Sequence, residues 1–279
     1  MNKVHSINNK SELQKIHIGK TEAYKIKINC PTLTPEEIVK FVLKHGEKGD
    51  VWVKTKSLSC FLKNKWLIFK KRQKKAYHLK RATDTVLGAI FFIGSLPIFL
   101  IAAIFVKLSS KGPIIFRQQR VDNNMRTFNL YKFRTMKDSQ EEKTHQEYMK
   151  KNINGNYCNN QQVYKLIDDP RTTSTGKWFR RLSLDELPQL INILKGDMSL
   201  VGPRPPIPYE VESYKKWHFA RFNAKPGLTG LWQVAGRSLI PFDEMIVLDL
   251  YYASNQSFWL DMKILLLTLP MVLSLKGAF

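Results

Sequence analysis

The sequence predicts an α+β, membrane-associated fold. We expect a proline-broken membrane helix that dips in and returns (re-entrant), a small cytosolic domain of helices with a β-hairpin, and a small mixed α/β N-terminal extension. Three observations predict this fold. Residues 85–106 are uncharged and contain Pro97, residues 112–136 alternate in polarity around a polar turn, and apolar residues recur at helical spacing over 184–194.

The charge of the chain is unevenly distributed. The 279 residues carry a formal net charge of +22, and residues 1–81 hold 20 basic but only 6 acidic residues. A basic segment beside an apolar run fits an anionic lipid surface, where each nearby Lys or Arg contributes about 1 kcal/mol. The same excess of charge is also typical of a nucleic-acid-binding arm, so composition alone leaves both partners open.

Cysteine usage indicates a reducing compartment. Cys30, Cys60 and Cys158 are far apart, and neither a CxxC motif nor a Cys/His cluster with zinc spacing occurs. We therefore expect the soluble part to lie in the cytosol. The first residues do not show the basic-then-apolar pattern of a cleaved export peptide.

Residues 1–62 are expected to form an accessory unit of unknown function. Residues 1–20 are polar and predicted to be loose. Alternation predicts strands at 23–29 and 50–58, and residues 34–46 have the N-terminal Thr-Pro and C-terminal Gly of a short helix. The pattern is that of a strand–helix–strand unit.

Residues 63–81 are densely basic and carry Trp66, Phe69 and Tyr77 between the cations. Directly before an apolar run, this composition favours a juxtamembrane anchor, with aromatic rings at headgroup depth and cations on lipid phosphates. The alternative is a nucleic-acid-binding patch.

The apolar run over 85–106 is long enough to cross a bilayer as a straight helix, but Pro97 predicts a kink near Gly94. A mildly kinked helix would cross, whereas a sharply broken one would return to the same face. A buried core helix is the third alternative. We favour the re-entrant topology because basic residues occupy both flanks: Lys80, Arg81, Lys107 and Lys111.

Residues 82–279, which include the apolar run, are predicted to form the main domain. Residues 112–136 predict a hairpin with a turn at Asp122–Asn124, and 139–165 predict a loop or short helices. Residues 226–237 indicate a turn, a strand and a turn. Residues 242–275 predict two apolar helices, of which the second is a candidate for the membrane interface.

An adjacent acid pair, Asp185–Glu186, is the most informative candidate for chemistry. The Ser183-x-x-Glu186 pattern matches a capping box at the start of a helix that ends near Gly196, so a structural role is the simpler interpretation. In the functional interpretation, neighbouring carboxylates on a helix point about 100° apart, so one can attack phosphorus while the other holds a cation.

Basic residues form a second group of candidates. Arg204 lies in the run Pro203–Pro206, whose prolines stiffen the backbone and would orient a guanidinium toward a phosphate. Lys132 and Arg134 alternate with apolar residues, so they share one face of a strand as either a solvated face or a cationic wall. Arg180 and Arg181 directly precede the acid pair. The sequence contains no P-loop, GxGxxG or GxSxG motif.

Taken together and in order, these motifs resemble the bacterial sugar-transferase family of monotopic polyprenyl-phosphate phosphoglycosyl transferases. The resemblance covers about residues 78–279. It rests on LKRATDTVLGAIFF before the proline-interrupted run, GPIIFRQQRV, FNLYKFRTM, DDPRTTSTGKWFRRLSLDELPQLINILKGDMSLVGPRP, KPGLTGLWQVAGR and LDLYYASNQSFWLDMKILLLT.

The resemblance implies transfer of a sugar-1-phosphate from a UDP-sugar to undecaprenyl (polyprenyl) phosphate, with release of UMP, as the first membrane step of glycan assembly. It implies that Asp185 is the nucleophile of a covalent phosphosugar-aspartyl intermediate and that Glu186 ligates Mg²⁺. The other positions that match the family pattern are the phosphate-binding Lys132, Arg181 and Arg204, and the additional acidic candidates Asp261 and Asp249.

The resemblance also implies a bacterial inner (cytoplasmic) membrane protein whose catalytic domain lies on the cytosolic face, with lipid and no nucleic acid as partners. Two departures stand out. The family often has Ser-Pro at the helix break, whereas here Ser95 lies one position further from Pro97, and larger members carry transmembrane helices where this chain has residues 1–80. The identity of the sugar and homo-oligomer formation stay open. The competing functions are a membrane-tethered nucleic-acid-binding regulator and an inactive assembly scaffold.

Overall fold

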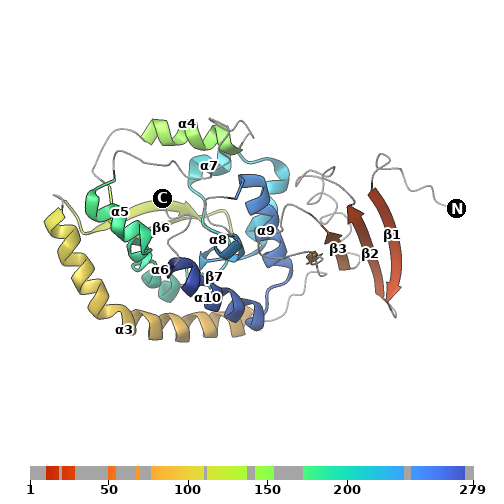
Figure 1. The fold of residues 1–279 in the computed structure, drawn as a ribbon, viewed down its shortest axis with the longest axis horizontal. Helices are drawn as coiled ribbons and strands as arrows, with labels where there is room; N and C mark the ends of the chain where they lie inside the picture. Colours follow the sequence, from red (N-terminus) through yellow and green to blue (C-terminus); the bar gives the residue numbers. More distant parts are fainter. Residues whose placement is uncertain are drawn as a thin grey trace.

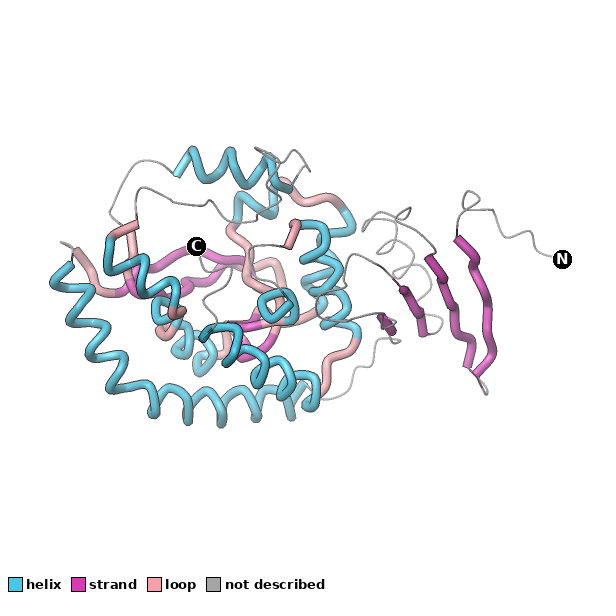
Figure 2. The backbone as a smooth tube through the Cα atoms, in the orientation of Figure 1, coloured by secondary structure: helices cyan, strands magenta, loops and turns pink. Residues whose placement is uncertain are grey.

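The computed structural model places a helical domain beside a small N-terminal sheet, with one long helix running along the edge of the domain (Figure 1, Figure 2). The structure describes residues 11–18, 21–28, 50–54, 67–69, 77–109, 112–136, 142–153, 172–235 and 240–273.

The N-terminal unit is a four-stranded sheet in the order β1-β2-β3-β4. Its strands are β1 (Ser11–Ile18), β2 (Thr21–Ile28), β3 (Asp50–Lys54) and β4 (Leu67–Phe69). The expected strands β2 and β3 are confirmed and pair in parallel, which requires a crossover between them. The expectation that residues 1–20 are loose is wrong for β1, which pairs with β2 in an antiparallel arrangement along its whole length. The predicted helix at 34–46 lies outside the described residues.

Helix α3 (Tyr77–Ser109) contains the predicted membrane segment and continues through Pro97 without a break in its assignment. Figure 1 shows it as a strongly bent helix that runs along the base of the domain and then turns up one side. A proline removes one backbone hydrogen bond and crowds the preceding turn, which accounts for the bend. Ser95 donates a hydrogen bond from Oγ to the carbonyl of Phe92, 3.0 Å away.

Both halves of α3 pack on the same domain. In the N-terminal half, Gly88 lies against Ile193 of helix α6 (Gln189–Lys195). In the C-terminal half, Ala102 and Val106 are buried with Phe133 and Phe179 in one apolar cluster. The domain is therefore held on the inner side of the bend.

The other face of α3 is apolar and exposed along its length. The exposed side chains are Val86, Ile90, Phe91, Ile93, Leu96, Ile98, Leu100, Ile101, Ile104, Phe105 and Leu108. The stretch His78–Ser109 is long and apolar enough to cross a membrane, and only 11% of its most apolar window is buried in the protein. An apolar face of this size needs a covering phase or partner.

The domain itself is built from short elements around one main core. These are β5 (Ile115–Val121), β6 (Thr127–Phe133), α4 (Glu142–Ile153), α5 (Ser174–Arg181), η2 (Leu184–Glu186), α6, β7 (Ser199–Val201), α7 (Pro208–Glu212), η3 (Lys216–Asn223), β8 (Gly227–Thr229), α8 (Leu231–Ala235), α9 (Phe242–Ser254) and α10 (Phe258–Leu273). Helix α9 is almost wholly buried at the centre, and α10 exposes Trp259, Leu266 and Leu269.

Most sequence expectations for this domain are confirmed. β5 and β6 form the antiparallel hairpin, and α9 and α10 are the two apolar helices. The expectation for 226–237 is only partly correct, because helix α8 follows strand β8. The strand itself ends after three residues, where its pairing with β7 ends.

The capping box is not formed. Ser183 has a positive φ of 55° and makes no side-chain capping bond. The acid pair lies in the short 3₁₀ turn η2, and the α-helix proper begins at Gln189, after Pro188. Proline is favoured at a helix start because it has no N–H to satisfy there. The prediction of a helix starting at Ser183 is thus wrong by about one and a half turns.

Candidate active site

The acid pair projects from a tight connection between two helices. α5 ends at Arg181, Ser183 takes a left-handed conformation that non-glycine residues rarely adopt, and η2 carries Asp185 and Glu186. Asp185 is buried and Glu186 is half-buried. A 3₁₀ turn of three residues per turn separates neighbouring side chains by about 120°, so the two carboxylates face different surroundings.

Lys132 faces the acid pair from the hairpin. Its Nζ lies 3.2 Å from Glu186 Oε1, and both side chains are partly accessible. Strand β6 positions it, because alternate residues of a strand share one face. Arg134 directly follows this strand and extends the backbone pairing, since its N–H donates to the carbonyl of Ile114. Lys132 thus has a carboxylate partner, and the shared face of Lys132 and Arg134 stays a prediction.

Arg134 is buried and occupies the space above Gly112. Gly112 has a φ of 122°, and a Cβ atom there would collide with the Arg134 guanidinium. Gly112 lies just beyond α3, so this arginine joins the end of the long helix to the strand that carries Lys132. Arg134 is therefore packed inside the domain and is not a free cation at its surface.

The two arginines before the acid pair diverge. Arg180 is half-buried and donates from Nη1 to Thr172 Oγ1 at 3.2 Å. Arg181 is exposed, and its Cζ lies 5.8 Å from the centre of the Trp178 ring. Because neighbouring helical residues point about 100° apart, α5 turns Arg180 toward the domain and Arg181 outward.

Arg204 lies in a loop held against the turn end of the hairpin. The carbonyls of Pro205 and Pro206 accept bonds from Arg120 and from the backbone N–H of Val121. The Arg204 guanidinium pairs with Glu210 at 3.4 Å, and Glu210 is fully buried. Burial raises the pKa of the Glu210 carboxyl, but the charges of Arg204 and the nearby arginines outweigh this effect and bring its pKa below the usual value.

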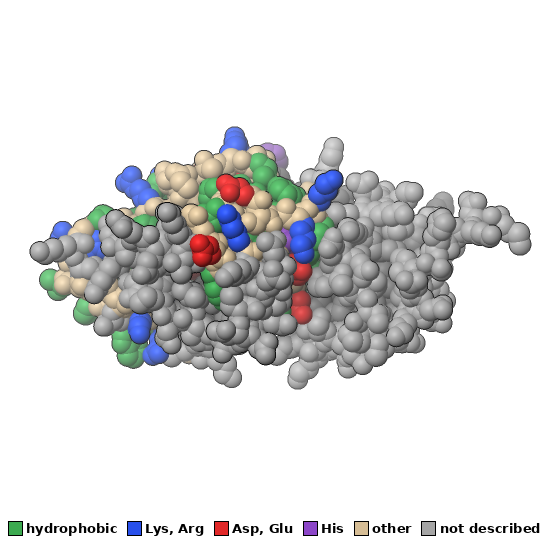
Figure 3. Space-filling model, turned by 90° about the horizontal axis from the view of Figure 1, so that it is seen from above, with side chains coloured by type: hydrophobic (Ala, Val, Ile, Leu, Met, Phe, Trp, Pro, Cys, Tyr) green, Lys and Arg blue, Asp and Glu red, His purple; other side chains and the backbone are tan. Residues whose placement is uncertain are grey.

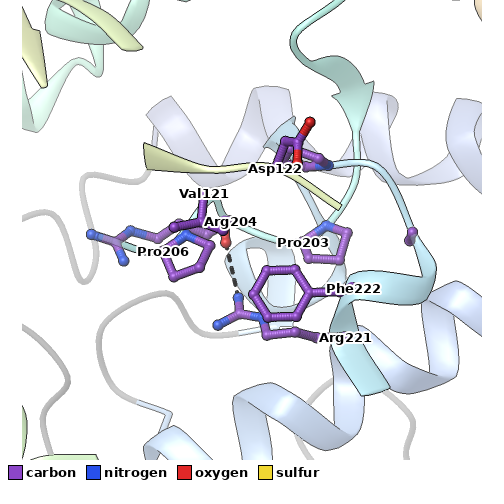
Figure 4. A pocket seen from close by; sticks show the side chains of 9 residues that line it. Val121, Asp122, Pro203, Arg204, Pro206, Arg221 and Phe222 are labelled. Carbon is purple, nitrogen blue, oxygen red and sulfur yellow. Dashed lines mark hydrogen bonds between the residues drawn. The ribbon is translucent and has the colours of Figure 1, made fainter. Parts of the chain in front are cut away.

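Asp249 takes part in a second buried pair next to this loop. Its carboxylate lies 2.7 Å from Arg221, which also donates to the backbone carbonyl of Arg204. Burial raises the pKa of Asp249 to about 6, against the opposing effect of Arg221. Figure 4 shows the small pocket at this point, walled by Pro203 and Phe222, with the Arg204 guanidinium directed away from Arg221.

Asp261 lies at the start of α10, where α3 begins. It accepts from Lys80 Nζ at 2.7 Å and from the Tyr252 hydroxyl at 2.8 Å. Asp84 is 3.7 Å from the same lysine and accepts from the backbone N–H of Leu200. Asp261 thus helps tie the two apolar helices to the domain. Asp261 pairs with Lys80, and Asp249 pairs with Arg221. Neither of these ion pairs includes Lys132 or Glu186.

The acid pair has the chemistry to hold Mg²⁺. This ion keeps several waters and is usually bound through one or two carboxylates together with substrate phosphates. Within the described ranges no group of three or more His, Cys, Asp or Glu residues has metal-binding geometry, so a site supplied wholly by the protein is not found there. Glu186, which is partly exposed, fits the mode in which one carboxylate and substrate phosphates hold the ion.

Several buried polar residues of these clusters were not predicted from the sequence. Glu210 had a recognisable signal, because it is the third residue of a helix that starts at Pro208 and its carboxylate accepts from the N–H of Ile207 at 2.9 Å. Arg221 and Tyr252 had none, because the carboxylates that they contact lie on other elements, Asp249 on α9 and Asp261 on α10.

Comparison with known proteins identifies the family to which residues 75–275 belong. Residues 75–275 match the model of a family described as bacterial sugar transferase. The chain is 45% identical over 200 residues to the galactosyl transferase CpsE of Streptococcus agalactiae and 38% identical over 200 residues to the exopolysaccharide production protein ExoY of Sinorhizobium fredii. It is 39% identical over 205 residues to the undecaprenyl-phosphate galactose phosphotransferase of Salmonella typhimurium.

These matches cover 70–72% of this chain but differ in how much of each relative they reach. They span 88% of ExoY and only 42% of each of the other two proteins. The chain therefore spans less than half the length of two of these relatives. The matched region includes α3 and all elements that carry the acid pair, and it excludes the strands β1 to β4.

Proposed function

The chain belongs to the bacterial sugar transferase family, and we propose that it transfers a sugar-1-phosphate from a UDP-sugar to undecaprenyl phosphate and releases UMP. The printed names of relatives support this reaction, since they include an undecaprenyl-phosphate galactose phosphotransferase and an undecaprenyl-phosphate glucose phosphotransferase. The observation that carries the proposal is the acid pair on η2, facing Lys132, in a domain packed on an apolar helix.

In the proposed first step, an Asp185 carboxylate oxygen attacks the β-phosphorus of the donor. The bond from that phosphorus to the bridging oxygen breaks, UMP leaves with the electron pair, and a sugar phosphate remains on Asp185 as an acyl phosphate. Repulsion between two anions opposes this attack. Lys132, on the strand beside the acid pair, offsets it by stabilising negative charge on the phosphates.

In the second step, a phosphate oxygen of undecaprenyl phosphate attacks the same phosphorus. The bond to Asp185 breaks, which restores the carboxylate and leaves the sugar diphosphate on the lipid. Arg204 is a further phosphate ligand, since proline neighbours and Glu210 fix its backbone and side chain. A Mg²⁺ ion held by Glu186 would supply further charge neutralisation in both steps.

The packing of α3 supports the proposed membrane topology. A straight helix of its 33 residues would be about 50 Å long, more than the roughly 30 Å hydrocarbon core of a bilayer. Both of its halves contact one polar domain, which cannot enter the hydrocarbon, while the outer face is free for lipid. This supports a helix that dips in and returns, with the domain on the cytosolic face of the bacterial inner membrane.

The covalent step is tested by trapping. Purified protein is incubated with Mg²⁺ and a UDP-sugar that carries a radiolabelled sugar, in the absence of lipid acceptor. We expect label on the wild-type chain, chased by undecaprenyl phosphate, and none on Asp185→Asn. Equal label on both proteins, or wild-type UMP release by Asp185→Asn, would exclude Asp185 as the nucleophile.

The topology has a separate test. Single cysteines replace Lys75 and Lys111, which flank α3, in a chain whose native cysteines are serine. In intact cells a membrane-impermeant thiol reagent is expected to reach neither position. Labelling of one position alone from outside would show that the helix crosses the membrane.

A further inference from the structure

The outer surface of helix α5 carries two apolar side chains and a cation. Trp178 is 62% exposed and Leu182, directly after the helix, is 39% exposed, although both are large apolar residues. Arg181 is exposed between them. Positions 178, 181 and 182 are spaced i, i+3 and i+4, so they share one face. The buried Phe179 points about 100° round the helix from Trp178, and the buried Gly176 lies opposite the patch. We refer to Trp178, Arg181 and Leu182 as the α5 outer patch.

The α5 outer patch is held together by a cation–π contact. The Arg181 guanidinium lies 5.8 Å from the centre of the Trp178 ring. An exposed indole beside a guanidinium is amphipathic, with an apolar body, one N–H donor and a positive charge. Tryptophan with this character is enriched at the membrane–water boundary, where the ring sits at headgroup level and the cation meets lipid phosphate.

The patch lies on a helix that packs against α3, the helix with the apolar outer face. Phe179 packs into the cluster that contains Ala102 and Val106, so α5 lies against the C-terminal half of α3. That half exposes Phe105 and Leu108 on its other side. Figure 3 shows this end of the molecule, at the left, with hydrophobic side chains among Lys and Arg, whereas the described acidic side chains lie nearer the middle.

We propose that the α5 outer patch contacts the anionic headgroup layer of the bilayer and so fixes the height of the acid pair above the membrane. Only two residues, Ser183 and Leu184, separate Leu182 from Asp185, so anchoring the patch positions the nucleophile at the depth of a lipid-borne phosphate. Arg181 then binds lipid headgroups, and the inward Arg180 is the cation that faces the domain. The inference about Asp185 rests on the proposed function, while the membrane contact does not.

Depth measurement tests the contact directly. Nitroxide labels are attached to single cysteines in the chain free of native cysteines, reconstituted in nanodiscs with anionic lipid. We compare Leu182→Cys with Ile104→Cys on the apolar face of α3 and Arg126→Cys at the far turn of the hairpin, where the side chain is 75% exposed. We expect oxygen and nickel accessibilities at position 182 between those at 104 and 126. Values equal to those at 126 would overturn the proposal.

Substitution tests the lipid partner. In nanodiscs with anionic lipid, Arg181→Gln is expected to lower transfer to undecaprenyl phosphate about fivefold, the equivalent of about 1 kcal/mol for one cation at a charged surface. In zwitterionic nanodiscs the loss is expected to vanish, and Arg126→Gln to have no effect in either lipid. A rise in the KM for UDP-sugar that is equal in both lipids would assign Arg181 to the donor instead. Failure of wild-type covalent labelling would refute the proposed function and leave the depth result standing.

Discussion

Two of the clusters of carboxylates and cations in this domain differ in burial. In the acid-pair site, Glu186 keeps 36% of its side chain exposed and meets Lys132 at 3.2 Å. In the loop cluster, Asp249 and Arg221 are each 2% exposed and meet at 2.7 Å. An accessible carboxylate can exchange its partner for a substrate or an ion, whereas a buried pair resists any change because an uncompensated charge there is costly.

This difference in burial indicates that one cluster serves catalysis and the other serves stability. The buried pairs anchor the proline-rich loop that carries Arg204, since Arg221 also donates to the Arg204 carbonyl and Glu210 accepts from the N–H of Ile207. In the acid-pair site, Lys132 and Glu186 are accessible enough to contact a substrate or an ion. We therefore expect substitutions in the first site to change catalysis and those in the second to change stability.

The largest expected effect is on catalysis. Asp185→Asn should reduce turnover by on the order of 10⁴-fold or more, because removal of a covalent nucleophile abolishes the two-step route. Its melting temperature should stay close to that of wild type. Turnover is measured as UMP release and stability as thermal unfolding in detergent. Glu212→Gln, on the exposed side of α7, is the matched control. A large loss of stability in Asp185→Asn would contradict the assignment of the acid pair to catalysis alone.

Arg221→Met should act in the opposite way. It leaves Asp249 buried without its ion partner, for an expected destabilisation of about 3–5 kcal/mol. The exposed Arg126→Met should change stability by less than about 0.5 kcal/mol. If both variants unfold at the wild-type temperature, the loop cluster does not have the structural role assigned to it.

The pH dependence of stability sharpens the same contrast. Burial raises the pKa of Asp249 to about 6, above its ordinary value of 3.8, so the folded state binds this proton more tightly than the unfolded state. The resulting stabilisation is present below pH 3.8 and is lost as the pH rises to about 6, with a total of about 3 kcal/mol. Unfolding of wild type and Asp249→Asn is compared across this window. We expect the difference between them to change with pH, and parallel curves would contradict the shift.

The smallest expected effect concerns the metal. Glu186→Gln should raise the Mg²⁺ concentration needed for half-maximal activity by about 10–100-fold, with little change in stability, because a ligand is lost from an accessible site. Activity is titrated with Mg²⁺ at saturating UDP-sugar. An unchanged Mg²⁺ requirement would assign metal binding elsewhere.

Local patterns of the sequence predicted much of the fold. The hairpin β5–β6, the apolar helices α9 and α10 and the helical run around Pro97 follow from alternation, helical periodicity and length, which are properties of neighbouring residues. The capping box was wrong because Pro188 is the stronger helix-start signal. The strand β1 was missed because pairing with β2, and not its own composition, stabilises it.

By itself the sequence determined the family, the acid pair and the uncharged helix interrupted by proline, because covalent order and residue type carry that information. Only the tertiary structure decided which cation meets which carboxylate. It joined Lys132 to Glu186, Arg221 to Asp249 and Lys80 to Asp261, and it turned Arg181 outward. These pairings depend on the packing of segments 28 to 181 residues apart, which local sequence patterns do not specify. Burial fixes the Arg221–Asp249 pair, because water is excluded from both side chains.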